Sequence, residues 1–347
     1  MFLRNHWYVA AQPGEVGREP LARRILGDAI VLYRTQGGRA VAMQDQCPHR
    51  KYALSKGRIE GDEIRCLYHG LKFDGAGRCT FIPGQDRIPS NLCARIYPLC
   101  EKHGWVWIWM GDPAEAVATR VPDFGLNTDP AWRAVFGYLA IESDYRLILD
   151  NFLDLTHVGY VHVGTIGNAP VSDAPIELVS EQGMVRFNRT MKAIPPSPTF
   201  VKLMQTEERI DRRTTSTWLP PSHFQNEVHA AHAGKLATNG AVQFYVNNSL
   251  TPETETTTHY FWAVTRNFQL QDASIGDLLG RENDAAFQED KVVIEEQQRM
   301  IAIESPPTPI MPIAADRGVL AMRRLLAKLE QEEEKERAGT ALLIDAE

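Results

Sequence analysis

The first third of the chain alternates short apolar runs with Gly and Asp turns. Gly27-Asp28 separates one pair of apolar runs, Gly61-Asp62 separates a second, and Gly75-Ala76-Gly77 separates a third. The series closes at Trp105-Val106-Trp107-Ile108-Trp109, where large side chains alternate. Runs this short, bounded by turn residues, are typical of antiparallel sheets or barrels. We therefore predict a small β region from Trp7 to about Pro113.

Longer strand-like segments follow in the second half of the chain. They are 184–187, 214–218, 224–232, 242–250 and 259–265. Thr251–Thr256 is interpreted as a turn that joins the last two segments into a hairpin. The pattern predicts further strands in this part of the chain.

One long helix is predicted from Ser274 to Glu304. Apolar residues recur along one stripe of it: Ile275, Leu279, Ala286, Val293 and Met300. Asp290 falls in the same stripe, and an acid on a core-facing stripe is costly unless it is paired or bound to a metal. Glu289, Glu295 and Glu296 are read as part of a solvated face.

The segment from Asp150 to His162 concentrates polar side chains. Read as a helix, Asn151, Asp154 and His157 share one face, because they recur at every third position. His162 lies about 140° from His157 on such a helix. Either the helix stops near Gly159, or a π-bulge brings the two imidazoles together.

Composition and charge exclude several classes of protein. The formal net charge of −7 argues against a nucleic-acid groove or an anionic membrane surface as partner. The first residues do not resemble a signal peptide, and no apolar stretch reaches transmembrane length. We expect a cytoplasmic protein. Pro113–Asp129 reads as a linker, so the predicted domains are 1–115 and 116–347.

Two predicted turns of the first domain carry a cysteine and a histidine each. They are Cys47-Pro48-His49 and Cys66-Leu67-Tyr68-His69. A zinc site is one interpretation, although structural zinc sites usually pair cysteines with cysteines and histidines with histidines. The mixed pairs suit a two-iron cluster, in which thiolates hold one iron and imidazoles the other.

The spacing Cys-x-His and Cys-x₂-His-Gly closely resembles the Rieske [2Fe–2S] motif. Asn151, Asp154, His157 and His162 match the second signature of Rieske non-haem iron oxygenases, Asn-x₂-Asp-x₂-His-x₄-His. The resemblance extends over nearly the whole chain and is strongest to oxygenase components of the vanillate O-demethylase type. Further segments that carry it are 4–10, 107–113, 220–223, 251–255 and 265–268.

The resemblance implies the fold and the metal sites. The fold would be α+β, with an N-terminal antiparallel β Rieske domain followed by a helix-grip catalytic domain, in which a curved antiparallel sheet grips the long C-terminal helix. His157 and His162 would hold a mononuclear Fe(II) together with a carboxylate. Asp290 is expected to be that carboxylate from its buried stripe, and the family pattern Phe-x-Glu-Asp also points to it.

The same resemblance implies roles for the other polar residues of this segment. Asp154 would bridge the cluster ligand His69 to the iron ligand His157 across the subunit interface of a homotrimer. Asn151 would lie near the iron, although a capping or solvent-facing role for it stays open.

Three residues fall near positions that contact substrate in the family: His223, Asn248 and Arg281. A cationic or hydrogen-bonding group there would hold the carboxylate or sulfonate of an aromatic acid. Arg281 also fits a surface role, paired with Glu282 or Asp284. The pocket is expected between the sheet and the iron-binding helix.

The expected activity is that of a terminal oxygenase component. It would hydroxylate a methoxy group of an aromatic acid such as vanillate, with loss of formaldehyde, or a methyl group of a toluate or toluenesulfonate. Ring dihydroxylation is an alternative, as is a Rieske electron-transfer protein without oxygenase activity. The chain has no Gly-rich dinucleotide fingerprint, so NADH would act through a separate flavin and [2Fe–2S] reductase.

Overall fold

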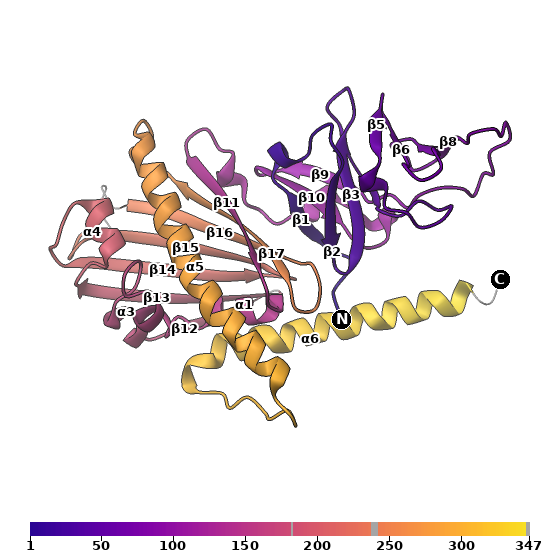
Figure 1. Cartoon of the computed structure of the whole chain (residues 1–347). Helices are drawn as coiled ribbons and strands as arrows, with labels where there is room; N and C mark the ends of the chain where they lie inside the picture. Colours follow the sequence, from indigo (N-terminus) through magenta and orange to yellow (C-terminus); the bar gives the residue numbers. More distant parts are fainter. Residues whose placement is uncertain (182, 237–241, 345–347) are drawn as a thin grey trace. The chain divides into compact units, whose positions relative to one another are not determined.

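The computed structural model describes residues 1–181, 183–236 and 242–344 (Figure 1). It divides into two compact units. The N-terminal unit comprises Phe2–Asp123 and Thr251–Thr254, and the C-terminal unit contains nearly all the rest. The first is built of strands and the second of a sheet with helices, so the predicted α+β class is confirmed. No helix in the described ranges is long and apolar enough to cross a membrane.

The N-terminal unit contains three small antiparallel sheets, as its turn pattern predicted. In spatial order, their strands are β1 (Trp7–Ala11), β10 (Trp105–Trp109) and β9 (Leu99–Lys102); β2 (Leu21–Ile25), β3 (Asp28–Arg34) and β4 (Ala40–Gln44); and β5 (Arg58–Glu60), β6 (Glu63–Arg65), β7 (Lys72–Phe73) and β8 (Cys79–Phe81). Short 3₁₀ turns lie between the strands at Pro13–Glu15 and Leu54–Lys56, and two more follow β10 at Pro113–Glu115 and Ala118–Arg120.

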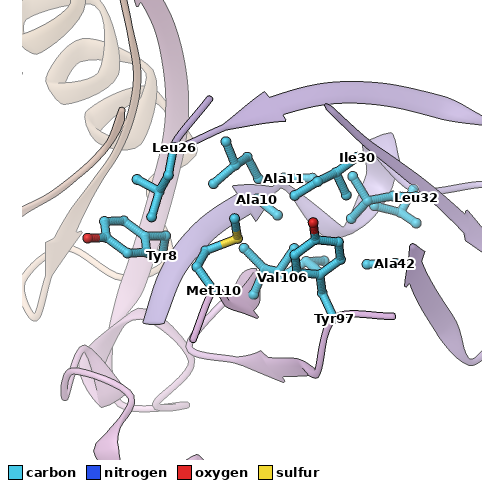
Figure 2. Close-up of a cluster of buried hydrophobic side chains, with 13 residues drawn as sticks. Tyr8, Ala10, Ala11, Leu26, Ile30, Leu32, Ala42, Tyr97, Val106 and Met110 are labelled. Atoms are coloured by element: carbon cyan, nitrogen blue, oxygen red, sulfur yellow. The ribbon is translucent and has the colours of Figure 1, made fainter. Parts of the chain in front are cut away.

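Two apolar clusters hold these sheets together. Figure 2 shows the first, in which Tyr8 and Met110 pack with Leu26, Ile30 and other buried side chains. The second cluster contains the two motif cysteines among large buried residues of β3, β6 and β7. Both thiols are therefore held by the core of the unit.

The two loops that carry the Cys and His pairs have the same backbone conformation. In each loop the cysteine N–H donates to the carbonyl five residues later, which is that of Tyr52 or Leu71, at 2.8 Å. The carbonyl of the cysteine accepts from the fourth residue onward, which is Lys51 after Cys47 and Gly70 after Cys66, at 2.8 and 3.0 Å. Both of these residues are left-handed, with φ of 59° and 75°. The second loop therefore repeats the first, with glycine where the first has lysine.

The C-terminal unit is built on one antiparallel sheet of seven strands. Its spatial order is β11 (Arg133–Ile141), β17 (Thr258–Arg266), β16 (Val242–Pro252), β15 (His223–His232), β14 (Ile210–Leu219), β13 (Met184–Ile194) and β12 (Glu177–Glu181). All five predicted strand segments lie within these strands. The predicted turn at 251–256 starts two residues too early, because β16 continues to Pro252 and the bends lie at 253–256.

Helices pack on this sheet, and the longest of them, α5 (Ala273–Ile303), crosses it obliquely (Figure 1). Gly276 and Gly280 let α5 approach β11 closely, because a Cβ atom at either position would lie 3.3 or 3.1 Å from the Val135 side chain. The other helices are α1 (Tyr145–Leu153), α2 (Val158–Val161), α3 (Ala169–Asp173), α4 (Pro198–Met204) and α6 (Arg317–Ile344), with 3₁₀ turns at Gly125–Asn127 and Ala314–Asp316.

Helix α5 confirms the predicted long helix and corrects its buried face. Leu279, Ala286 and Asp290 are buried as predicted, but Val293 and Met300 are 45% and 49% exposed. A spacing of seven residues drifts about 20° per repeat around a straight helix, so the stripe leaves the core after two repeats. The face that stays buried continues instead through Ile294.

The predicted continuous helix around Asp154 is wrong. Helix α1 ends at Leu153, and α2 starts at Val158, so the break precedes Gly159 and involves no π-bulge. The Asp154 carboxylate accepts from the Thr156 N–H at 2.9 Å and from its hydroxyl at 2.5 Å. Such an Asx turn gives the backbone an alternative to the helical hydrogen bond, which explains the break.

The repeated loops predict unequal effects of two substitutions. Gly70→Ala puts a Cβ on a left-handed residue, 3.2 Å from the Pro83 side chain. We expect it to destabilise the N-terminal unit by roughly 1–2 kcal/mol and to lower occupancy of the expected iron–sulfur cluster. Lys51→Gly, in the equivalent position, relieves strain and should retain the cluster. Visible absorption and thermal unfolding measure both effects; equal losses in the two variants would contradict the strain argument.

Candidate metal centres

Three side chains of the C-terminal unit converge on one point. Asp290 Oδ1 lies 3.4 Å from His157 Nε2 and 3.1 Å from His162 Nε2. One ligand atom from each residue lies within 4.8 Å of the other two, and no other such His, Cys, Asp or Glu group occurs in the described part of the chain. His162 and Asp290 are buried, at 1% and 7% exposure.

The short helix α2 brings the two imidazoles together. His157 is its N-cap and His162 its C-cap, and the helix between them has only four residues. The ring centroids lie 5.2 Å apart at an interplanar angle of 72°. Because neither histidine lies inside a regular helix, the angular separation expected for a continuous helix does not apply. Ligands can therefore approach one metal ion from two directions.

Hydrogen bonds fix which nitrogen of each imidazole faces Asp290. His157 Nδ1 bonds to the backbone carbonyl of Asp154, which requires a proton on Nδ1. His162 Nδ1 lies 2.8 Å from Glu289 Oε2, and the same oxygen accepts from the Thr165 hydroxyl at 2.8 Å. Both Nε2 atoms are therefore free to act as metal ligands.

Glu289 was read from the sequence as part of a solvated face, and that interpretation is wrong. Its side chain is 32% exposed and holds His162 from the side opposite Asp290. The available signal was its position next to Asp290, since consecutive helical residues differ by only about 100°. A carboxylate on the outer nitrogen of a ligating imidazole is the usual orienting partner in metal sites.

The pKa values of the two histidines are shifted in opposite directions. Burial lowers the pKa of His157, although Asp290 opposes that shift. Burial also lowers the pKa of His162, but Asp290 and Glu289 together outweigh it and raise that pKa. Two imidazole nitrogens and a carboxylate oxygen in this arrangement match the two-His, one-carboxylate set of mononuclear iron sites. The residues present thus fit an iron ion.

Asn151 and Asp154 both adjoin this centre. Asn151 Nδ2 donates to Asp290 Oδ1 at 3.0 Å, and its Oδ1 is buried with no hydrogen-bond partner in the described ranges. Asp154 contacts His157 through its backbone carbonyl, while its carboxylate forms the Asx turn. The bridge from Asp154 to His69 that the family resemblance implies stays a prediction.

The two motif loops of the N-terminal unit separate thiols from imidazoles. Cys47 and Cys66 are buried at 2% and 1% exposure, whereas His49 and His69 are exposed. The two imidazole centroids lie 4.6 Å apart. An inner pair of sulfur atoms and an outer pair of nitrogen atoms fits a Rieske cluster, in which each pair holds one iron. Burial, opposed by the backbone at His49, raises the pKa of Cys47 to about 11. Binding of a metal by this thiol would release its proton.

The structure does not bring the three predicted substrate residues together. His223 and Asn248 are fully buried, but the pairing of Phe224 with Asn248 puts Asn248 on the sheet face opposite His223. His223 Nδ1 lies 2.9 Å from the Ser249 hydroxyl, and Asn248 Oδ1 accepts from Tyr260 at 2.6 Å. Arg281 is exposed on α5, beside a shallow hollow.

An apolar pocket lies between the sheet and helices α2 and α5, where the sequence predicted it. Leu155, Val158 and Phe287 line it on the helix side, each within three residues of an iron-ligand candidate. Met191 and Phe244 line it from the sheet. A small aromatic molecule in this pocket would lie beside the metal centre.

Two family models match the chain: the Rieske [2Fe-2S] domain over residues 6–92, and the vanillate O-demethylase oxygenase C-terminal domain over residues 141–332. A putative toluene-4-sulfonate monooxygenase system iron–sulfur subunit of Comamonas testosteroni is 39% identical, with 98% of this chain and 100% of the relative aligned. The vanillate O-demethylase oxygenase subunit of Pseudomonas sp. is 33% identical, with 99% of both chains aligned.

Solved structures agree with this assignment. Dicamba monooxygenase bound to 3,6-dichlorosalicylic acid superposes with a TM-score of 0.91 at 34% identity, over 96% of this chain and 99% of that one. With the Rieske loops and the His157–His162–Asp290 group already described, the comparisons lead to one conclusion. The chain belongs to the vanillate O-demethylase family of Rieske non-haem iron monooxygenases, as an oxygenase component with a [2Fe–2S] cluster and a mononuclear iron site.

Proposed function

We propose that this oxygenase component hydroxylates a methyl or methoxy carbon of an aromatic acid. The observation that carries the proposal is the apolar pocket, whose lining residues Leu155, Val158 and Phe287 lie within three positions of His157 or Asp290 in the sequence. A Rieske electron-transfer protein would need neither this pocket nor a second metal-ligating group. Ring dihydroxylation would use the same ligands, but the relatives named above are monooxygenases and demethylases.

A mononuclear iron held by His157, His162 and Asp290 would supply the activation of O₂. In the overall reaction, one oxygen atom is inserted into a C–H bond and the other leaves as water, with two electrons and two protons consumed. A hydroxylated methyl group is a stable alcohol. A hydroxylated methoxy group is a hemiacetal, which collapses to a phenol and formaldehyde.

The residues of the chain would position the reactants. His157, His162 and Asp290 would hold the metal, and Glu289 would fix the His162 ring. Asn151 would hold Asp290 through the amide hydrogen bond. The apolar lining of the pocket would exclude water, so that the two electrons are used to hydroxylate the substrate and are not lost in side reactions.

A methyl-bearing arenesulfonate is the second candidate substrate class. The toluene-4-sulfonate relatives are 39% identical to this chain, compared with 33% for the vanillate enzyme and 35% for the dicamba enzyme of Stenotrophomonas maltophilia. The reductase would be a separate flavin and [2Fe–2S] protein that oxidises NADH in the cytoplasm. A homotrimer, with Asp154 bridging His69 and His157 of neighbouring subunits, follows from the family resemblance.

A substrate panel tests the proposed activity. The full chain, with both metal sites loaded, is combined with a surrogate reductase, NADH and O₂. We expect turnover of toluene-4-sulfonate, 4-toluate, vanillate or another methoxybenzoate, with an alcohol or formaldehyde as product detected by mass spectrometry. NADH oxidation that yields only peroxide with every compound would reject the proposal.

Asp290→Ala is expected to empty the mononuclear site and spare the Rieske cluster. Iron should fall from about three to about two per chain, while the red-brown absorption is retained. Glu296→Ala, an exposed acid on the same helix paired with Arg299, is the matched control and should keep all the iron. Full iron and full activity in Asp290→Ala would show that the third ligand lies elsewhere.

Two substitutions of Asp154 separate the effect of its charge from the effect of the turn that it forms. Asp154→Asn can still accept from Thr156 but has no charge, whereas Asp154→Ala loses both properties. If Asp154 couples the two metal centres, both variants should keep about three irons per chain and lose at least about tenfold in coupled turnover. Single-turnover oxidation of the reduced cluster measures this. Full activity in Asp154→Asn would assign the residue a structural role only.

A further inference from the structure

Two buried arginines lie on the pocket face of the sheet. Arg189 on β13 and Arg212 on β14 are 1% and 8% exposed, and both line the pocket. Arg189 pairs with Thr214, and Met191 pairs with Arg212. The two arginines are therefore diagonal neighbours on one sheet face, close enough for long side chains to meet. The nearby sheet side chains of the pocket are largely apolar.

No carboxylate of the described residues forms an ion pair with either arginine. The charge of Asp154 acts on Arg189, but from beyond ion-pair distance. Glu282, near the pocket, is taken up by Thr199 and Lys202. Burial and the neighbouring Arg189 lower the pKa of Arg212 to about 10. Two like charges without a counter-ion in an apolar pocket are costly, so an anion that enters the pocket would be stabilised.

Both guanidinium groups have donor capacity left. Arg189 Nη1 donates to the Val171 carbonyl at 2.5 Å and to the Leu155 carbonyl at 3.5 Å, and Arg212 Nη1 donates to the Ile166 carbonyl at 3.3 Å. The Nε atoms of both arginines and the hydroxyl of Thr214 are buried without a hydrogen-bond partner in the described part of the chain. Three unsatisfied donors thus come from adjacent positions on one face, and buried donors of this kind are usually satisfied by a bound water, ion or ligand.

We propose that Arg189, Arg212 and Thr214 form an oxyanion subsite that binds the sulfonate group of an arenesulfonate substrate. A sulfonate has three acceptor oxygens, one for each unsatisfied donor, whereas a carboxylate has two. The ring would lie along Met191, Val228 and Phe244, toward the metal centre. The assignment deepens the proposed function, on which it rests, and differs from the substrate positions that the family resemblance implied.

A structural role is the competing explanation, since each arginine also binds a loop carbonyl. The two explanations predict opposite effects on the ligand-free protein. If the arginines brace the loops, their removal lowers stability. If they form an empty anion subsite, replacing an uncompensated buried charge by methionine leaves the melting temperature unchanged or raises it.

The test measures binding by calorimetry, without turnover, using the full-length protein with both metal sites loaded. The ligands are toluene-4-sulfonate, 4-toluate and the neutral 4-toluenesulfonamide. The variants are Arg189→Met and Arg212→Met. Arg213→Met is the matched control, because Arg213 lies on the same strand but is exposed on the opposite face.

We expect the native protein to bind the sulfonate at least about tenfold more tightly than the sulfonamide, with 4-toluate between them. Either pocket variant should weaken sulfonate binding by about 10- to 100-fold and leave sulfonamide binding within about threefold. Arg213→Met should match the native protein. Unchanged sulfonate affinity in both pocket variants, or a lower melting temperature of the ligand-free variants, overturns the subsite.

The comparison of ligands in the native protein is a second test, which needs no variant. A sulfonate preference below about tenfold over the sulfonamide rejects it. The outcome is also separate from that of the activity assay. Arginine-dependent sulfonate binding without any product would support the subsite and reject the oxygenase proposal. Product formation together with sulfonate binding that does not depend on the arginines would support the oxygenase proposal and reject the subsite.

Discussion

The C-terminal unit depends on the burial of one carboxylate. Asp290 is 7% exposed on α5, and a charge there without partners would cost several kcal/mol. Two imidazoles and the Asn151 amide surround its Oδ1 atom, and all three come from the segment 151–162. The break after α1 and the single turn of α2 are what allow that segment to approach one oxygen from several sides. The fold of this unit and the geometry of its metal site therefore both depend on how Asp290 is buried.

Much of this architecture follows from local patterns in the sequence. The strands and the ends of α5 could be predicted because hydrophobic periodicity and turn residues act over a few neighbouring positions. The burial of Asp290 could be predicted because it interrupts an apolar stripe. The break at Asp154 could not, since it depends on one side-chain bond to Thr156 that periodicity does not reveal.

The metal ligands could be predicted from the sequence, whereas the two pocket arginines could not. The ligands lie in short motifs whose spacing reflects their chemistry. Arg189 and Arg212 are 23 positions apart (212 minus 189) and become neighbours only through the pairing of β13 with β14. A buried arginine also runs against the usual exposure of that residue type. Pocket chemistry of this kind requires the register of the sheet, which a single sequence does not provide.

His162 is held at both ring nitrogens by consecutive residues of one helix, Nδ1 by Glu289 and Nε2 by Asp290. A flip of the ring would break both contacts at once. The orientation of this imidazole is thus fixed by α5, a helix of 31 residues, and not by α2, a helix of four. The loop after α2 contributes through Thr165, whose hydroxyl donates to the same Glu289 oxygen.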